Sequence, residues 1–243
     1  MDILYVVGRG SDWNNNELRY SLRSIAKYGK HIGRVFLVGY KPDFVNDKVI
    51  HIPCEDPFPV KHNNILYKVL YAAQHSDIAS HFLISSDDHY YVAPTDFDNL
   101  PVYYRREEIP LKPSKREWHE YALSLHDTRG LLEEFGLSIY QTNPHCNTHF
   151  DMDVYRRHKN LFDIGFRFPE GAELNCIMGN LLIREGWKSA PFVDAKLNNT
   201  LSLAEIEERA KESGCISSKE NVDTSLLVEY LHKKFPNKCK YEL

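Results

Sequence analysis

Short apolar runs of strand length alternate with helix-length segments through the first hundred residues of this 243-residue chain. Two amphipathic stretches, residues 16–28 and 63–75, carry their apolar side chains on one face and therefore predict helices. Continuous apolar runs separated by helices are typical of parallel strands buried on both faces. The four runs lie at residues 3–7, 35–38, 49–53 and 82–84. The sequence therefore predicts an α/β fold with a mostly parallel, Rossmann-like central sheet flanked by helices.

The regular alternation weakens after about residue 104. A last short strand is predicted at residues 102–104, and residues 144–153 are predicted to be irregular. Further helices are predicted at residues 118–135, 153–164, 202–213 and 224–235, so this part is mainly helical. The length suits one large domain. We predict a single domain over residues 1–243, with residues 1–104 as the nucleotide-binding half and residues 105–243 as an acceptor and closing half.

Charge and hydropathy give no sign of a membrane or nucleic-acid protein. The net charge is −4, which provides no general attraction to nucleic acid or to anionic lipid. No apolar run approaches the ~20 residues that a bilayer-spanning helix needs, and the first residues lack the layout of a signal peptide. The five cysteines are scattered without metal or redox spacing, so we interpret them as reduced thiols. A cytoplasmic protein without a membrane span is expected.

Two adjacent carboxylates follow the fourth apolar run. Residues 81–91 read HFLISSDDHYY, with Asp87 and Asp88 at the point where the strand stops. Open α/β sheets bind ligands outside the carboxyl ends of their strands. Adjacent carboxylates repel each other, and a divalent cation such as Mg²⁺ or Mn²⁺ relieves that repulsion. The pair therefore predicts a metal site, with a solvated acidic turn as the alternative.

A glycine-containing turn follows the first run and can let the backbone approach a ligand closely. The full phosphate-binding fingerprint and the Walker lysine motif are both absent. Lys68, on the helix before the acidic strand, can neutralise phosphate charge, or it can be part of a solvated helix face. The residues expected to contact a bound nucleotide are Gly8, Arg9, Gly10, Ser11, Asp12, Lys68 and Ser86.

Further polar residues in the second half are candidates for the site. His149 could be a third ligand of the cation or contact the phosphates, and the alternative is a hydrogen-bonded structural histidine. A structural zinc site with His145 is disfavoured because Pro144 argues against a helix here. Glu173, Glu170 or Asp151 could act as a general base, or they could be surface charges.

The order of these motifs resembles a known family. It comprises an apolar first strand, NNNELRYSLRSI at residues 14–25, VG-x-x-P at 38–42, the helix with Lys68, and FLI-x-x-DDH at 82–89. This is similar to the GT-A-fold nucleotide-sugar glycosyltransferases, including small bacterial and phage-encoded members. The ELRYSLRS segment also resembles Stealth-type sugar-phosphate transferases of capsule synthesis. The resemblance covers about residues 2–104.

The resemblance implies roles for individual residues. Asp87 and Asp88 match an acidic motif that holds Mn²⁺ or Mg²⁺ on the donor diphosphate, although the usual form is Asp-x-Asp and His89 stands at the third position here. Lys68 matches a basic residue of the donor pocket, and His149 matches a late histidine that closes the metal site. Asp88, with Glu173 or Asp151 as base, would then be catalytic.

The expected function is metal-dependent transfer of a sugar from a nucleotide-sugar donor to an acceptor hydroxyl. The acceptor would be a glycan or a hydroxylated DNA base. A local basic surface for nucleic acid could come from residues of an otherwise ordinary loop, namely Arg105, Arg106, Lys112, Lys115 and Arg116. Two alternatives remain: a Stealth-type sugar-phosphate transferase, and a non-catalytic nucleotide-binding module.

Overall fold

The structure is a computed structural model that describes residues 1–9, 11, 13–111, 119–192, 194, 196–197, 202–218 and 224–243. Two predicted nucleotide contacts, Gly10 and Asp12, lie outside the described residues. The same holds for Lys112, Lys115 and Arg116 of the predicted basic loop.

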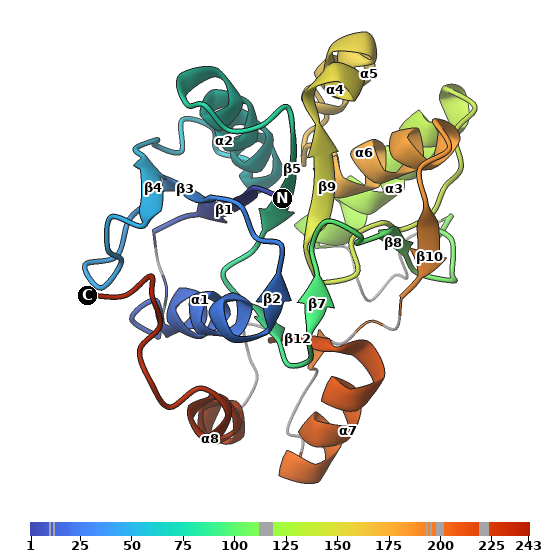
Figure 1. Cartoon of the computed structure of the whole chain (residues 1–243). Helices are drawn as coiled ribbons and strands as arrows, with labels where there is room; N and C mark the ends of the chain where they lie inside the picture. The colour runs from blue at the N-terminus through green and yellow to red at the C-terminus, as the bar shows by residue number, and fades with distance from the viewer. Residues whose placement is uncertain are drawn as a thin grey trace.

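A five-stranded sheet forms the centre of the molecule (Figure 1). Its strands are β1 (Ile3–Val7), β3 (Val35–Gly39), β4 (Val49–Ile52), β5 (His81–Ser85) and β9 (Thr148–Asp151), in the order β4-β3-β1-β5-β9. The first four are parallel, and β9 runs antiparallel to β5. This confirms the predicted fold class as far as an α/β fold with a mostly parallel central sheet and flanking helices.

Helices α1 (Asn16–Tyr28) and α2 (Lys61–His75) lie on opposite sides of this sheet in Figure 1. Alternate residues of β1 show why. Leu4 belongs to the same buried cluster as Val69 of α2, whereas Tyr5 belongs to the cluster that contains Leu22 of α1. A strand with apolar side chains on both faces needs a cover on each. The continuous apolar runs in the sequence are therefore explained by two-sided burial.

Strand β9 occupies a segment that was predicted to be irregular, and that prediction was wrong. The strand has only four residues and pairs at the edge of the sheet with β5. Phe150 and Phe82 face each other across this pair, with ring centroids 5.5 Å apart. The hydrophobic pairing to a distant strand, rather than a local pattern, makes this segment extended.

The second half is mainly helical, as predicted. Its helices beside the sheet are α3 (Glu120–Glu134), α4 (Met152–Arg157), α5 (Lys159–Gly165) and α6 (Leu174–Arg184). The helix predicted at residues 153–164 is in fact two helices with a break at His158. Strand β8 (Val102–Tyr104) lies outside the central sheet and pairs with β10 (Ser189–Pro191).

A smaller sheet lies below α1 and carries a third buried cluster. Its strands are β6 (His89–Tyr91), β11 (Lys196–Leu197) and β12 (Cys215–Ser218), and its neighbours are α7 (Leu203–Ser213) and α8 (Thr224–Lys234). The strand order is β11-β12-β6, and β6 follows directly on the acidic pair. Two short strands, β2 (Gly29–Lys30) and β7 (Thr95–Asp96), pair with each other. No described helix combines the length and the apolar character that crossing a bilayer requires.

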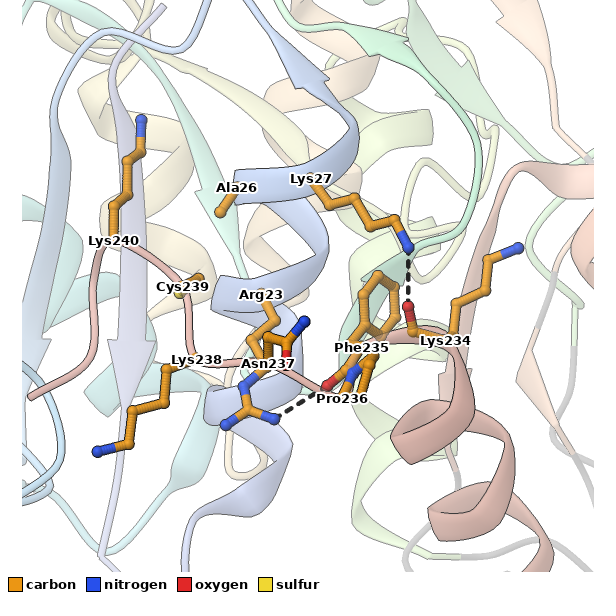
Figure 2. Close-up of a pocket in the computed structure, with 10 residues that line it drawn as sticks. All are labelled: Arg23, Ala26, Lys27, Lys234, Phe235, Pro236, Asn237, Lys238, Cys239 and Lys240. Atoms are coloured by element: carbon orange, nitrogen blue, oxygen red, sulfur yellow. Dashed lines mark hydrogen bonds between the residues drawn. The ribbon is translucent and has the colours of Figure 1, made fainter.

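The segment after α8 returns along α1 (Figure 2). Arg23 of α1 donates from Nη1 to the carbonyl of Phe235, and Lys27 donates to the carbonyl of Lys234. A pocket of about 340 Å³ lies between α1 and this segment, and none of the predicted site residues lines it. Its lysines point in different directions in Figure 2 and do not converge on a common ligand.

Candidate active site

Asp87 and Asp88 form the turn between β5 and β6, so they lie at the carboxyl end of a parallel strand, as the sequence predicted. Both are half-buried. Ser217 of β12 donates a hydrogen bond from Oγ to Asp88 Oδ2 at 2.6 Å. Burial, together with the negative charges of Asp88 and Glu17, raises the pKa of Asp87 to about 7. The ionised form of Asp87 is therefore disfavoured in the structure, and an added positive charge would stabilise it.

Glu17 is a neighbour of this turn that sequence reasoning missed. It lies in the first turn of α1, where a negative charge is favourable. Ser11 donates to Glu17 Oε2 at 2.8 Å and accepts from the Asn15 backbone N–H at 2.8 Å. Ser11, a predicted nucleotide contact, thus orders the loop between β1 and α1. The sequence holds no signal that would place Glu17 beside Asp87.

Lys68 lies under the carboxyl ends of β1 and β3. Its side chain is buried, and Nζ is 3.1 Å from the carbonyl oxygen of Val7 and 2.6 Å from Asp56 Oδ1. Gly39, at φ +107°, ends β3 beside it, and a Cβ there would lie 2.1 Å from the Val7 oxygen. Only glycine lets the two strand ends and the lysine meet this closely. The ammonium group therefore stands at the same edge of the sheet as the acidic turn.

The other described nucleotide candidates are exposed at this edge. Gly8 ends β1, and Arg9 stacks over the ring of Tyr40 at 5.6 Å with Glu55 at 3.6 Å. Ser86 directly precedes the acidic pair. These residues form a rim rather than a closed pocket.

His149 does not join the acidic pair, which corrects the prediction of a third metal ligand. It lies inside β9 opposite Leu83, two residues before the end of β5. Its Nε2 is 3.0 Å from the carbonyl oxygen of Leu100, so Nε2 carries the proton, and Nδ1 accepts from His81 Nε2 at 3.0 Å. Burial lowers the pKa of His149 to about 4, so it is a neutral structural histidine.

Asp151 is also absent from the site. It pairs with His81 at the amino end of β5, the opposite end from Asp87. There it is the N-cap of α4 and accepts from the backbone N–H groups of Asp153 and Val154. The structure therefore corrects its prediction as a general base.

Glu173 lies in a buried polar cluster with residues from both predicted halves of the chain. Its Oε1 is 2.9 Å from His62 Nδ1 at the start of α2, and its Oε2 accepts from Asn143 at 2.9 Å. Burial alone would lower the pKa of His62, but the hydrogen bond and charge of Glu173 outweigh it and raise the pKa. Tyr121 stacks on the imidazole at 6.2 Å. Glu173 therefore orients His62, which adjoins Lys61, a residue whose charge acts on Asp87.

His89 takes the third position of the acidic motif but is buried, and burial lowers its pKa to about 4. The charge of His145 acts on His89, and His145 belongs to a polar group in which Asp194 Oδ1 is 2.7 Å from His145 Nδ1 and Asp194 Oδ2 is 2.5 Å from Arg105 Nη2. Arg105 is therefore part of an ion network.

The residues present fit a cation that takes few protein ligands. Across the described residues, no group of three or more His, Cys, Asp or Glu side chains could hold a metal ion. Mg²⁺ and Mn²⁺ need only one or two carboxylates when phosphate oxygens and water complete the shell. Asp87 and Asp88 supply those two, and the raised pKa of Asp87 indicates a place where positive charge would be stabilising.

Comparison with known proteins adds little to the site. No family model and no curated protein matches the chain. Among solved structures, the galactosyltransferase LgtC with donor and acceptor sugar analogs matches at a TM-score of 0.49 and 10% identity, over 98% of this chain and 96% of that one. An active-site mutant of LgtC matches at a TM-score of 0.48 and 10% identity, over 99% of this chain and 98% of that one.

A nucleoside-diphosphate-sugar pyrophosphorylase from Vibrio cholerae RC9 gives a TM-score of 0.38 and 14% identity, over 79% of this chain and 91% of that one. Likenesses this weak carry no weight for the site or its substrates.

Proposed function

We propose that this protein is a metal-dependent glycosyltransferase that moves a sugar from a nucleotide-sugar donor to an acceptor hydroxyl. The observation that carries the proposal is the turn of Asp87 and Asp88 at the carboxyl end of β5. At Asp87, burial and the negative charges of Asp88 and Glu17 outweigh the positive charge of Lys61. Such an arrangement suits a bound cation better than a structural ion pair.

The donor diphosphate is proposed to lie between this turn and Lys68. A divalent cation, when bound at Asp87 and Asp88, supplies neutralisation of the charge that develops on the leaving diphosphate. Lys68 adds a second, buried positive charge at the ends of β1 and β3. Gly8, Arg9, Ser11 and Ser86 are the proposed contacts of the nucleoside, with Gly10 and Asp12 outside the described residues.

The acceptor is proposed to approach from the second half of the chain. Glu173 and His62 stand between the halves, and Glu173 holds the imidazole in one orientation. If the reaction inverts the anomeric centre, Glu173 and His62 together are the proposed proton acceptor. Glu173 alone is less suited to this role, because His62 and Asn143 already occupy its two carboxylate oxygens. The acceptor hydroxyl is proposed to belong to a glycan or to a hydroxylated DNA base.

The test is Asp88→Asn, assayed with Mn²⁺ against a panel of uridine and guanosine diphosphate sugars. We expect turnover to fall about a hundredfold or more, as when a charge-stabilising group is removed. Asp163→Asn is the matched control, because Asp163 is an exposed partner of Lys159 and its loss should leave turnover unchanged. Undiminished turnover in Asp88→Asn would remove the metal from the mechanism.

The released product separates the proposal from its rivals. A glycosyltransferase releases a nucleoside diphosphate, whereas a Stealth-type sugar-phosphate transferase releases a nucleoside monophosphate. A non-catalytic nucleotide-binding module releases neither, although it would still bind the panel. Chromatography of the reaction mixture distinguishes all three.

A further inference from the structure

A second pocket, of about 480 Å³, lies where α1 begins. Its wall comes from the residues just before α1, from the segment after β3 and from the last residues of the chain. Its volume is typical of a small-molecule site, for which the usual range is about 300–1,000 Å³. None of the described residues proposed to bind the donor or the metal ion lines it. The pocket therefore has a lining of its own and no role so far.

Arg19 of α1 presents an uncommitted guanidinium group to this pocket. Its Nε is buried and has no hydrogen-bond partner among the described residues. The guanidinium lies over the ring of Phe44, 4.3 Å from the centroid, and such stacking fixes its plane. Its side chain is 31% exposed, and its Nη1 is 4.0 Å from Glu242 Oε2, which is too far for a hydrogen bond. The donors of Arg19 are therefore available to a ligand.

Glu242 does not neutralise Arg19, because its carboxylate already serves another guanidinium. Oε1 accepts from Arg23 Nε at 2.7 Å, and Oε2 accepts from Arg23 Nη2 at 2.8 Å. A bidentate pair of this kind is the strong form of an ion pair between arginine and a carboxylate. The charge of Glu242 is thus balanced by Arg23, and the charge of Arg19 is left over.

Two further charged residues line the pocket, Lys238 and Asp43. Lys238 Nζ donates to the carbonyl of Leu243 at 2.7 Å, an uncharged group that takes one of its three hydrogens. Asp43 is exposed, so water and salt screen its charge. Arg19 and Lys238 therefore outweigh Asp43, and the lining favours an oxyanion.

The uncharged polar part of the lining can bind hydroxyl groups. Asn15 is the N-cap of α1, a position where an Asn side chain usually accepts from the helix backbone, yet it makes no such hydrogen bond. Asn14 before it is exposed, and it also lines the pocket. The two amides and the Tyr40 hydroxyl each donate and accept, as the hydroxyl groups of a sugar do.

We propose that this pocket binds an anionic sugar, meaning a small sugar that carries a phosphate or a carboxylate group. Arg19 and Lys238 hold the oxyanion, and Asn14, Asn15 and Tyr40 bind the sugar hydroxyls. A planar guanidinium held flat on a ring is suited to bidentate contact with either oxyanion. The proposal does not rest on the proposed function, because the pocket shares no described residue with the donor site.

The first measurement is calorimetry with glucose 6-phosphate, glucuronate, glucose and inorganic phosphate. We expect saturable binding of at least one of the two anionic sugars, with a Kd of about 1 mM or tighter, and no binding of glucose. Which of the two binds more tightly assigns the oxyanion as phosphate or carboxylate. Binding of neither, or binding of glucose or inorganic phosphate as tight as that of the anionic sugars, would overturn the proposal.

The second measurement compares variants with the anionic sugar that binds. Arg19→Met should weaken binding about tenfold or more, because the oxyanion loses its charged partner. Arg156→Met is the matched control, since it removes an exposed arginine paired with Asp153 on α4, and it should leave the affinity unchanged. Lys238→Gln alters an exposed residue and should weaken binding as well, so it provides the test if Arg19→Met does not fold. Wild-type affinity in Arg19→Met or in Lys238→Gln would refute the assignment.

The third measurement separates this pocket from the donor site, which adjoins it where the Tyr40 ring lies 5.6 Å from Arg9. Asp88→Asn should bind the anionic sugar as the wild type does. Saturating uridine diphosphate with Mn²⁺ should not displace the sugar from the wild type. Loss of binding in either experiment would place the sugar in the donor site and end the proposal of a second site. If the wild type binds no nucleotide, the proposed function fails, and Asp88→Asn still decides the question for this pocket.

Discussion

Asp87 occupies a position that is unfavourable for a carboxylate, because Asp88 and Glu17 add negative charge and burial removes water. We predict that Asp87→Asn raises the unfolding midpoint of the metal-free protein by about 2–4 °C, equivalent to roughly 1 kcal/mol. The same variant should lose the stabilisation that added Mn²⁺ gives the wild type. Differential scanning fluorimetry with and without Mn²⁺ measures both, and a lowered midpoint without metal would contradict the electrostatic argument.

Lys68 is the second residue whose environment argues for a ligand. Its ammonium is buried beside a carbonyl and a half-exposed carboxylate. We predict that Lys68→Met weakens binding of uridine or guanosine diphosphate at least tenfold, because the proposed counter-charge of the diphosphate is lost. Lys159→Met removes an exposed lysine and should leave affinity unchanged. Calorimetry measures both variants, and equal affinities would exclude Lys68 from the pocket.

At the scale of elements, the direction of β9 decides which predicted residues reach the site. Asp87 and Lys68 lie at one edge of the sheet because the carboxyl ends of parallel strands share it, and their roles in binding stay a prediction. The segment around His149 was predicted to be irregular, so the sequence assigned it no direction. Since β9 runs antiparallel, it starts at Thr148 near the carboxyl end of β5 and carries Asp151 to the far end. The pairing that sets this direction is with residues about 65 positions earlier, beyond the reach of a local pattern.

The hydrogen bond between His81 and His149 makes this strand pair sensitive to acid. Burial lowers the pKa of both imidazoles, so the folded state favours their neutral forms. Their contribution to stability is complete above the unfolded pKa of about 6.5 and is lost as pH falls toward 4.

We predict that His149→Phe is less stable than wild type at pH 7, because two hydrogen bonds are lost, and that the difference shrinks by on the order of 2 kcal/mol by pH 4.5. Urea unfolding at both pH values measures it. The variant should keep the Mn²⁺ response of the wild type, since His149 is not a ligand. Loss of that response would restore the original prediction.

At the scale of the whole molecule, the elements that were predicted well are those whose partners are near in sequence. β1, α1, β3 and α2 follow from local apolar periodicity, since each packs on its neighbours in the chain. The small sheet was not predicted, because its strands are far apart in the sequence. Tyr90 of β6 pairs with Ile216 of β12, and no local pattern indicates this pairing. Its residue Ser217 nevertheless reaches Asp88, so a distant part of the chain completes the candidate site. The division at residue 104 remains a prediction.

A long-range contact joins α1 to the last residues of the chain. Arg23 donates from Nε and Nη2 to the two carboxylate oxygens of Glu242, at 2.7 and 2.8 Å, and both residues are buried. Burial alone would raise the pKa of Glu242, but the Arg23 hydrogen bonds outweigh it and lower the pKa. The stabilisation is therefore present above the unfolded pKa of about 4.3 and is lost as pH falls through the lower folded value.

We predict that Glu242→Gln lowers the free energy of unfolding by about 3 kcal/mol at pH 7, because Arg23 is left buried without a counter-charge. The difference from wild type should narrow as pH falls below 4, because the pH then approaches the lowered pKa of the wild-type carboxylate. Urea unfolding at pH 7 and pH 3 measures both. Glu185→Gln, which removes the exposed partner of Arg157, should cost under about 1 kcal/mol at either pH. Equal effects of the two variants at pH 7 would mean that the buried pair does not hold the end of the chain against α1.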